Sequence, residues 1–176
     1  MAKAKWAVDV SHSEIGFSVK HMMIAKVKGT FHDFEASIEA DPADLTTADI
    51  EFAIDLSSVD TRNADRDNHL KSADFFDIEK NPKLLFKATK IVRTGDDEYD
   101  ITGDVTLHGV TRSETFSATF EGVGKDPWGN EKAGFSATGS LKRSDYGLTY
   151  NAALETGGVL IGDEVKIAIE IEAAKA

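Results

Sequence analysis

The sequence has no cysteine, only three prolines and no long apolar run. The absence of cysteine excludes disulfide bonds, thiolate metal sites and a cysteine nucleophile. The longest apolar runs, such as residues 22–25, are far shorter than the roughly 20 residues that a membrane-spanning helix needs. No apolar segment follows the N-terminal lysines, as a signal peptide would require. We therefore expect a chain without an integral membrane segment, located in the cytoplasm.

Basic residues are scarce relative to acidic ones. The 176 residues include 20 Lys and Arg against 31 Asp and Glu, which gives a formal net charge of −11. Nucleic-acid binding needs a basic surface and anionic lipid attracts basic segments, so this charge argues against both kinds of partner. With 41% hydrophobic residues, the chain has enough apolar side chains for the core of a single domain over residues 1–176.

What the sequence does have is an alternation of apolar and polar residues with a period of two. Such alternation is typical of strands with one dry side and one solvent-facing side. It favours an antiparallel sheet and excludes a doubly wound parallel sheet, whose strands are apolar throughout. Two architectures can bury such strands, a sandwich or a closed up-and-down barrel. The eight alternating segments are residues 15–20, 34–39, 50–56, 84–88, 99–107, 116–121, 135–141 and 165–172.

Two stretches lack this alternation. Residues 21–29 carry Met22 and Met23 without a clean period. Because methionine adapts its shape, these two are candidates for a flexible gate, although a methionine-filled gap beneath a loop is the simpler explanation. Residues near 63–77 are typical of a short helical segment with Asn63 as its N-cap, and we expect this segment to cover one barrel end as a lid or plug.

Several motifs resemble those of the YceI-like family. The most specific one covers residues 58–77, which read SVDTRNADRDNHLKSADFFD and are similar to the family signature almost throughout. Four further segments resemble family elements and occur in the same order. They are DVSHSEIGFSVKH at residues 9–21, Gly29-Thr30-Phe31 with Phe34, GDVTLHGVT at 103–111 and RSDYGL at 143–148. The resemblance covers nearly the whole chain and implies a single YceI-like domain.

This resemblance implies an all-β fold, namely an extended, lipocalin-like, eight-stranded antiparallel up-and-down barrel. It also implies a homodimer that carries a polyisoprenoid or a similar long amphiphilic lipid in an apolar cavity, without a cofactor. The residues alone leave the cavity open, because small inward residues such as Gly103 and Gly139 leave space either for a ligand or for neighbouring phenylalanine rings.

Inward apolar residues of the strands are the candidates for a cavity lining, although a filled core would show the same pattern. Three cationic or titratable side chains of the lid, Arg62, Arg66 and His69, are candidates for contact with an anionic headgroup such as a diphosphate. The lining candidates are Phe17, Val19, Phe34, Ile38, Phe52, Ile54, Phe86, Ile101, Val105, Phe116, Phe135, Ile167 and Ile169. The candidates for the lid or polar mouth are Met22, Met23, Arg62, Arg66, His69, Phe75 and Phe76.

Two alternatives stay open: a non-catalytic stress or structural protein with a filled barrel, and an enzyme or metal protein that depends on His12, Asp67 and His69. Asp67 and His69 do not converge with Asp65 on a helix, and the segment lacks the glycine and glutamate of an EF-hand. His12 follows Asp9 closely but has no nucleophile elbow nearby, so we expect it to be a hydrogen-bonded structural histidine. We predict no catalytic residue and no metal site.

Overall fold

The computed structural model describes residues 3–152, 154–155 and 157–176. Most of it is β-strand in one antiparallel sheet, as the alternating pattern predicts. The strands are β1 (Ala4–Val8), β2 (Glu14–His21), β3 (Ala25–Phe31), β4 (Phe34–Asp41), β5 (Asp44–Asp55), β6 (Val59–Asp60), β7 (Lys83–Arg93), β8 (Glu98–Leu107), β9 (Val110–Lys125), β10 (Glu131–Lys142) and β11 (Ile161–Lys175). Helix α1 spans Ala64–Lys71, and short 3-10 helices span Val10–His12 (η1), Leu56–Ser58 (η2) and Arg143–Tyr146 (η3).

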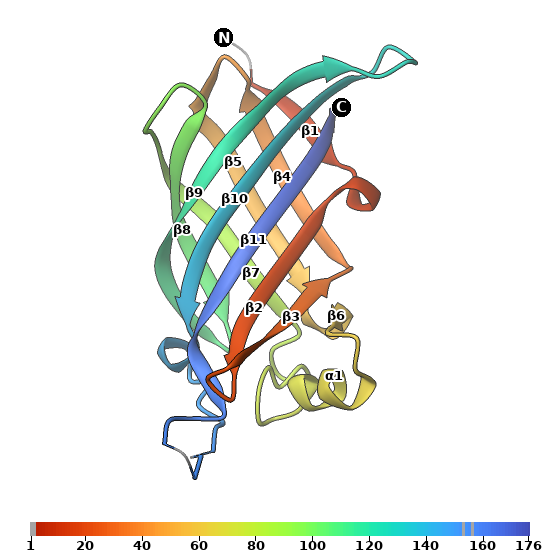
Figure 1. Ribbon diagram of the computed structural model, residues 1–176. Coiled ribbons are helices and arrows are strands. Elements are labelled where there is room, and N and C mark those ends of the chain that lie inside the picture. The colour runs from red at the N-terminus through yellow and green to blue at the C-terminus, as the bar shows by residue number, and fades with distance from the viewer. Residues whose placement is uncertain (1–2, 153, 156) are drawn as a thin grey trace.

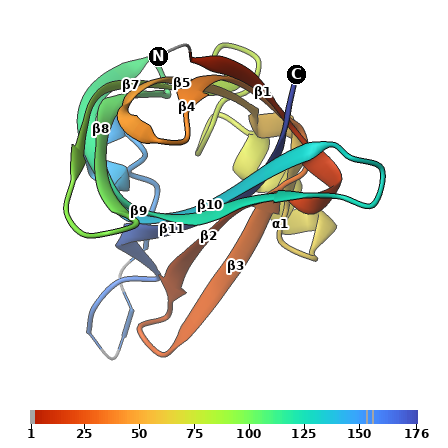
Figure 2. The same cartoon turned by 90° about the horizontal axis from the view of Figure 1, so that it is seen from above.

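Eight long strands form the wall, because three of them are each interrupted once. β1 and β2 both pair with β11 and are separated by η1, and their partners β3 and β4 are likewise consecutive parts of one strand. β5 continues through η2 into β6, which pairs with β3. Each long strand pairs with the next along the chain and the last pairs with the first, so the sheet closes into a ring (Figure 2). The predicted eight-stranded antiparallel up-and-down barrel is confirmed.

The three interruptions lie side by side in the wall. The His32 N–H donates to the Ser58 carbonyl at 3.4 Å, and the Asp55 N–H donates to the Asp33 carbonyl at 2.9 Å. These two bonds join the break between β3 and β4 to the break at η2, and η1 interrupts the neighbouring strand. On this side of the barrel, β2, β3 and β6 continue the wall below this level, next to α1 (Figure 1).

Strand β3 was not predicted, although it alternates in the same way as the others. Its inward position Gly29 is buried, and a Cβ on this glycine would lie 2.5 Å from Cζ of the Phe17 ring. The ring of the paired strand therefore takes the place of a side chain on β3. Because no large apolar residue marks this position, the strand has a weak signal in the sequence.

Rings from one strand also cover glycines of other strands. A Cβ on Gly139 would lie 2.4 Å from Cδ2 of Phe116, and one on Gly103 would lie 2.6 Å from the Phe86 ring. These two phenylalanine rings meet edge to face, with their centroids 5.6 Å apart. The small inward residues thus hold aromatic rings, and the core around them includes Trp6, Ile15, Leu56 and Ile171.

The two ends of the barrel differ (Figure 1). Both termini lie at the upper end, whereas α1, the β2–β3 turn and the connection from β10 to β11 lie at the lower end. The predicted N-cap of α1 is confirmed, since the Asn63 side chain accepts a hydrogen bond from the Arg66 N–H at 3.0 Å. In the described part of the chain, no helix is long and apolar enough to span a membrane.

Candidate functional site

A cavity of about 420 Å³ lies inside the barrel. Its lining includes residues of α1 and of the β10–β11 connection, which places it toward the lower end in Figure 1. Its exposed lining residues, Lys20 and Tyr150, both lie at that end, so the cavity opens there. The wall is apolar almost throughout, and the volume is in the range of small-molecule sites in proteins.

Most of the predicted lining residues face this cavity. Ile38 instead lines a second, smaller cavity of about 60 Å³, because β4 runs up beside β1 toward the other end of the barrel. Phe34 lines neither cavity. Its buried ring packs against Phe52, with 6.4 Å between the centroids, and Phe52 itself faces the large cavity. Eleven of the thirteen candidates do line the large cavity: Phe17, Val19, Phe52, Ile54, Phe86, Ile101, Val105, Phe116, Phe135, Ile167 and Ile169.

Three side chains separate the two cavities. Ile50, Ile101 and Phe135 line both of them, and we call these three residues the waist. Phe135 lies on β10 opposite Phe120 of β9 and Ile171 of β11. The large cavity ends at the waist, so these side chains set its depth.

The segment after β6 covers the lower end, where a lid was predicted. Arg66, His69, Phe75 and Phe76 line the cavity from this segment. The His69 ring meets Phe75 and Tyr150 edge to face, at centroid distances of 5.0 and 4.9 Å. Since Tyr150 belongs to the β10–β11 connection, these ring contacts join the two sides of the mouth.

Three of the mouth candidates do not face the cavity. Arg62 is exposed and has a left-handed backbone with φ of 65°, which turns the chain into α1. Met22 and Met23 form the exposed turn between β2 and β3 and lie on the outside of the mouth. The two methionines therefore lie outside the cavity lining, with Met23 against Gly158 of the β10–β11 connection, and a gating role for them stays a prediction.

Every charged residue in the described lining is basic. Lys20, Arg66 and Arg143 line the cavity, together with His21 and His69, and no carboxylate does. Nε and Nη2 of Arg66 donate to the hydroxyl and the carbonyl of Thr61, at 2.8 and 2.6 Å. An apolar tube with basic groups at its open end matches a molecule with a long apolar tail and an anionic or polar head.

Arg143 is a residue of the site that sequence reasoning missed. Its buried guanidinium donates to the carbonyls of Leu148, Tyr150, Ile161 and Gly162, at 2.8 to 3.3 Å. These bonds hold the β10–β11 connection against the barrel and so position Tyr150 at the mouth. Burial lowers the pKa of the guanidinium. The one available signal was the RSDYGL motif itself, which places a basic residue directly after a strand.

Tyr146 closes the same corner of the cavity. Its ring is fully buried and lines the cavity, and its hydroxyl donates to Oε2 of Glu114 at 2.6 Å. Burial, followed by the hydrogen bond to Glu114, raises the pKa of the Tyr146 phenol well above its usual value. The phenol therefore stays protonated and keeps the carboxylate of Glu114 paired.

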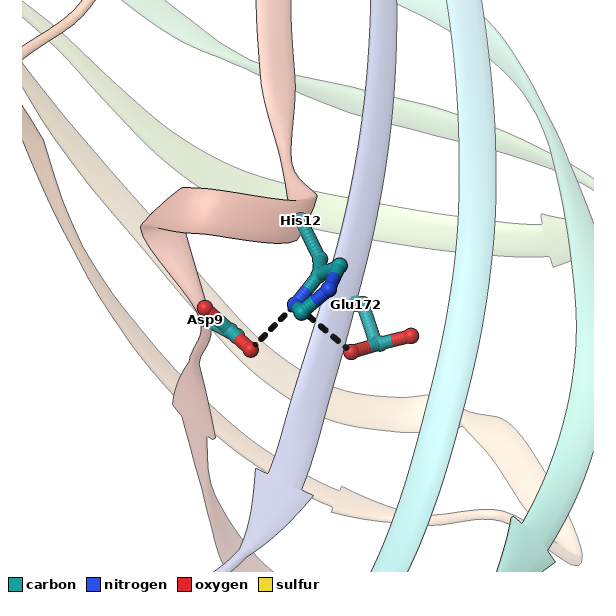
Figure 3. A group of neighbouring side chains, drawn as sticks. All are labelled: Asp9, His12 and Glu172. Carbon is teal, nitrogen blue, oxygen red and sulfur yellow. Dashed lines mark hydrogen bonds and ion pairs between the residues drawn. The ribbon is translucent and has the colours of Figure 1, made fainter. Parts of the chain in front are cut away.

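A polar cluster lies where η1 interrupts the wall (Figure 3). His12 Nδ1 lies 2.7 Å from Oδ2 of Asp9 and 3.5 Å from Oε2 of Glu172. Hydrogen bonds from Ser11 and then from His12 lower the pKa of Asp9 to about 2. The bond to Asp9 and the charges of Asp9 and Glu172 raise the pKa of His12. His12 is thus hydrogen-bonded as expected.

The residues of the metal or enzyme alternative do not come together. Asp67 accepts hydrogen bonds from the N–H and hydroxyl of Thr61, and His69 Nε2 is bonded to Asp74 at 2.9 Å. Among the described residues, one group has three potential ligand atoms within 4.8 Å of one another, and it is Asp9, His12 and Glu172. Its hydrogen bonds account for this arrangement as part of the η1 turn.

A family model described as the YceI-like domain matches residues 6–173. The chain belongs to the YceI-like family. A UPF0312 protein of Staphylococcus epidermidis is 43% identical to it over 96% of both chains. One from Staphylococcus aureus is 41% identical over 93% of this chain and 94% of its own length.

Solved structures place the barrel among YceI-like folds. The YceI protein of Campylobacter jejuni is 35% identical, with a TM-score of 0.77 over 89% of this chain and 90% of its own. BcnA of Burkholderia cenocepacia has a TM-score of 0.82 at 24% identity, covering 94% and 98% of the two chains. A polyisoprenoid-binding domain of Saccharophagus degradans has a TM-score of 0.73 at 14% identity, covering 98% and 99%. The last two likenesses concern the fold alone.

Proposed function

We propose that this YceI-like protein binds a polyisoprenoid or a similar long amphiphilic lipid in its barrel, and that it acts as a carrier rather than as an enzyme. The observation that carries the proposal is the apolar cavity with basic groups at its open end. Each buried methylene group of a bound chain contributes about 0.8 kcal/mol. Ordering the flexible chain and losing translational freedom offset part of this gain.

The ligand has a defined orientation in this proposal. Its tail lies along the phenylalanines and isoleucines of the wall and ends at the waist. Its head lies at the lower end near His21 and Arg66. An anionic head would complement these groups, and Arg62 takes no part because it does not line the cavity.

Family membership and one fold relative support the same proposal. The Saccharophagus degradans domain is described as polyisoprenoid-binding, and it shares the barrel fold with this chain. A barrel filled by its own side chains, which was the structural alternative, would leave no hollow of this size. The cytoplasmic location and the homodimer stay predictions, which cell fractionation and analytical ultracentrifugation would test.

The test is to identify what the purified protein holds. Organic-solvent extraction followed by mass spectrometry is expected to release a long-chain isoprenoid or another amphiphile, and the stripped protein is expected to take up an added polyprenol. Ile167→Asp places a charge in the cavity wall and should abolish uptake, because an apolar chain in the cavity would remove water from the unpaired carboxylate. Uptake of no lipid by folded, stripped protein would contradict the proposal.

A matched control lies on the same strand. Ala168 is next to Ile167 on β11 but is exposed on the outer face. Ala168→Asp introduces the same carboxylate outside the barrel and should leave polyprenol uptake unchanged. If both variants lose uptake equally while remaining folded, the effect does not come from the cavity.

A further inference from the structure

The hairpin of β2 and β3 ends in an exposed apolar turn. Ile24 is 86% exposed, and Met22 and Met23 are 45% and 53% exposed. Exposed apolar residues are ordinary when isolated, but these three are consecutive. The Met22 N–H donates to the carbonyl of Leu160 at 2.8 Å, so the β10–β11 connection lies directly beside this turn. We call Met22, Met23 and Ile24 the apolar tip.

The backbone of the apolar tip is also unfavourable for its residues. Met22 and Met23 have φ of 55° and 65°, in the left-handed region. Two successive positive φ values are the requirement of a type I′ hairpin turn, for which Asn-Gly is the favoured sequence. Methionine at these positions costs conformational energy and leaves about half of each apolar side chain exposed to water. Neither property stabilises the barrel, which points to a role outside folding.

The charge of the hairpin is the reverse of that of the whole protein. No acidic residue occurs between Glu14 and Asp33, although the chain has a net charge of −11. Lys20 and Lys26 are paired directly across the hairpin, an arrangement in which like charges destabilise a sheet. Lys28 follows on the same face. In the described part of the chain, no ion pair within 4.0 Å neutralises these lysines.

We propose that the apolar tip and the lysines behind it dock this protein on the surface of an anionic lipid bilayer. Interfacial binding of this kind combines apolar side chains inserted among the lipids with lysines near the anionic headgroups. The net charge of −11 argued against such docking. However, charges farther away than the Debye length of about 8 Å at physiological salt are largely screened. The local charge of the hairpin therefore determines whether an anionic bilayer attracts it.

A second copy of the chain fits this surface less well. Two hairpins packed tip to tip would bring their lysines together, whereas an anionic bilayer complements them. The hairpin and the neighbouring β10–β11 connection project on the same side of the barrel (Figure 2), so a flat surface can contact both. The connection contributes two acidic residues, Asp145 and Glu155, against the three lysines.

Docking at this place would put the cavity mouth against the membrane. Lys20 and His21 of the hairpin line the cavity and precede the apolar tip directly. A lipid leaving the bilayer would therefore pass the basic lining on its way in. This consequence rests on the proposed function, whereas docking itself can be tested on vesicles that contain no isoprenoid.

The experiment is co-sedimentation of the full chain with vesicles of phosphatidylglycerol and phosphatidylcholine in equal parts, or of phosphatidylcholine alone. The wild-type protein is expected to bind the anionic vesicles and to bind the neutral ones weakly. Ile24→Ser should weaken binding about tenfold, because its side chain no longer enters the lipid. Lys26→Gln with Lys28→Gln should remove the preference for anionic vesicles.

A second tip variant separates docking from folding. Met22→Asn with Met23→Gly places residues that tolerate a positive φ at both positions, so thermal unfolding should occur at or above the wild-type temperature while vesicle binding falls. Trp128 is the matched control, since it is 83% exposed in the loop between β9 and β10 at the opposite end of the barrel. Trp128→Ser should bind vesicles like the wild type.

Several results would overturn the inference. These are a wild type that does not bind anionic vesicles, equal binding by Ile24→Ser and the wild type, or a loss of binding in Trp128→Ser alone. Self-association without vesicles that disappears in Ile24→Ser would assign the apolar tip to a second copy instead. Because the vesicles contain no isoprenoid, failure here leaves polyprenol uptake intact, and failure of polyprenol uptake leaves vesicle binding intact.

Discussion

The depth of the large cavity is set by the waist, so Phe135→Ala should lengthen the chain that the barrel accepts. Phe135 lines both cavities, and removing its ring joins the cavity of about 420 Å³ to the one of about 60 Å³. The ring vacates the space of about six carbon atoms, which suits about one further isoprene unit of five carbons. At about 0.8 kcal/mol per buried carbon, that unit gains about 4 kcal/mol before ordering costs.

Ordering the extra unit cancels about half of this gain, which leaves about 2 kcal/mol, or about a thirtyfold preference for the longer chain. The assay is competition among polyprenols that differ by one isoprene unit, with native mass spectrometry reading the bound fraction. The substitution should destabilise the fold by about 3 kcal/mol, at the low end for Phe→Ala, because cavities already flank the ring.

Phe34→Ala is the matched control for this experiment. It removes the same ring from a buried position that lines neither cavity, so it should cost stability without changing the preferred chain length. A folded Phe135→Ala variant with the chain-length profile of the wild type would refute the idea that the waist is the floor of the site.

Three further predictions concern the surroundings of the cavity. Arg143→Lys removes hydrogen bonds to buried carbonyls and should cost about 3 kcal/mol in urea unfolding, with faster amide exchange in the β10–β11 connection. Gly139→Ala places a methyl group 2.4 Å from the Phe116 ring, so it should cost about 2 kcal/mol in the same assay and reduce polyprenol uptake. Because the pKa of His12 is raised, its protonated ring stabilises the junction of β1 and β2. This contribution is complete below pH 6.5, the ordinary pKa of histidine, and is lost as pH rises through the raised pKa. The lowered pKa of Asp9 gives a contribution that is present above pH 3.8 and is lost as pH falls toward about 2. Protection of the β1 amides, corrected for the intrinsic exchange rate at each pH, should therefore be greatest between these limits, and His12→Gln should remove its fall on the alkaline side.

The period-two alternation predicted most of the wall correctly. Seven of the eight alternating segments lie within a strand, and segment 50–56 passes the end of β5 by one residue, Leu56 of η2. The pattern succeeds because a strand that separates core from solvent must alternate. Strand β3 was missed because Gly29 stands where an apolar side chain would mark the inner face. β1 and β6 are short pieces beyond the interruptions, and a few residues carry too little periodicity to be recognised.

The alternating sequence pattern could not predict the cavity. Gly103 and Gly139 turned out to hold phenylalanine rings, so small inward residues did not mark the empty space. Nor does the sequence show that Arg143 bonds to four carbonyls, because backbone acceptors carry no residue identity. The exposed tip was seen only as a break in the pattern, since exposure depends on where the turn projects.

The neighbouring breaks at η1, at η2 and between β3 and β4 have a mechanical consequence for the wall. A single break would bend one strand, but breaks in three adjacent strands form a crease across that side of the barrel. We expect deformation to concentrate along this line of breaks, because the strand ladder is interrupted there, and we expect the uninterrupted strands from β7 to β11 to move less. The part of the wall below the three breaks carries the hairpin and lies next to α1 (Figure 1). Widening the lower end of the barrel therefore disturbs little of the sheet above the breaks.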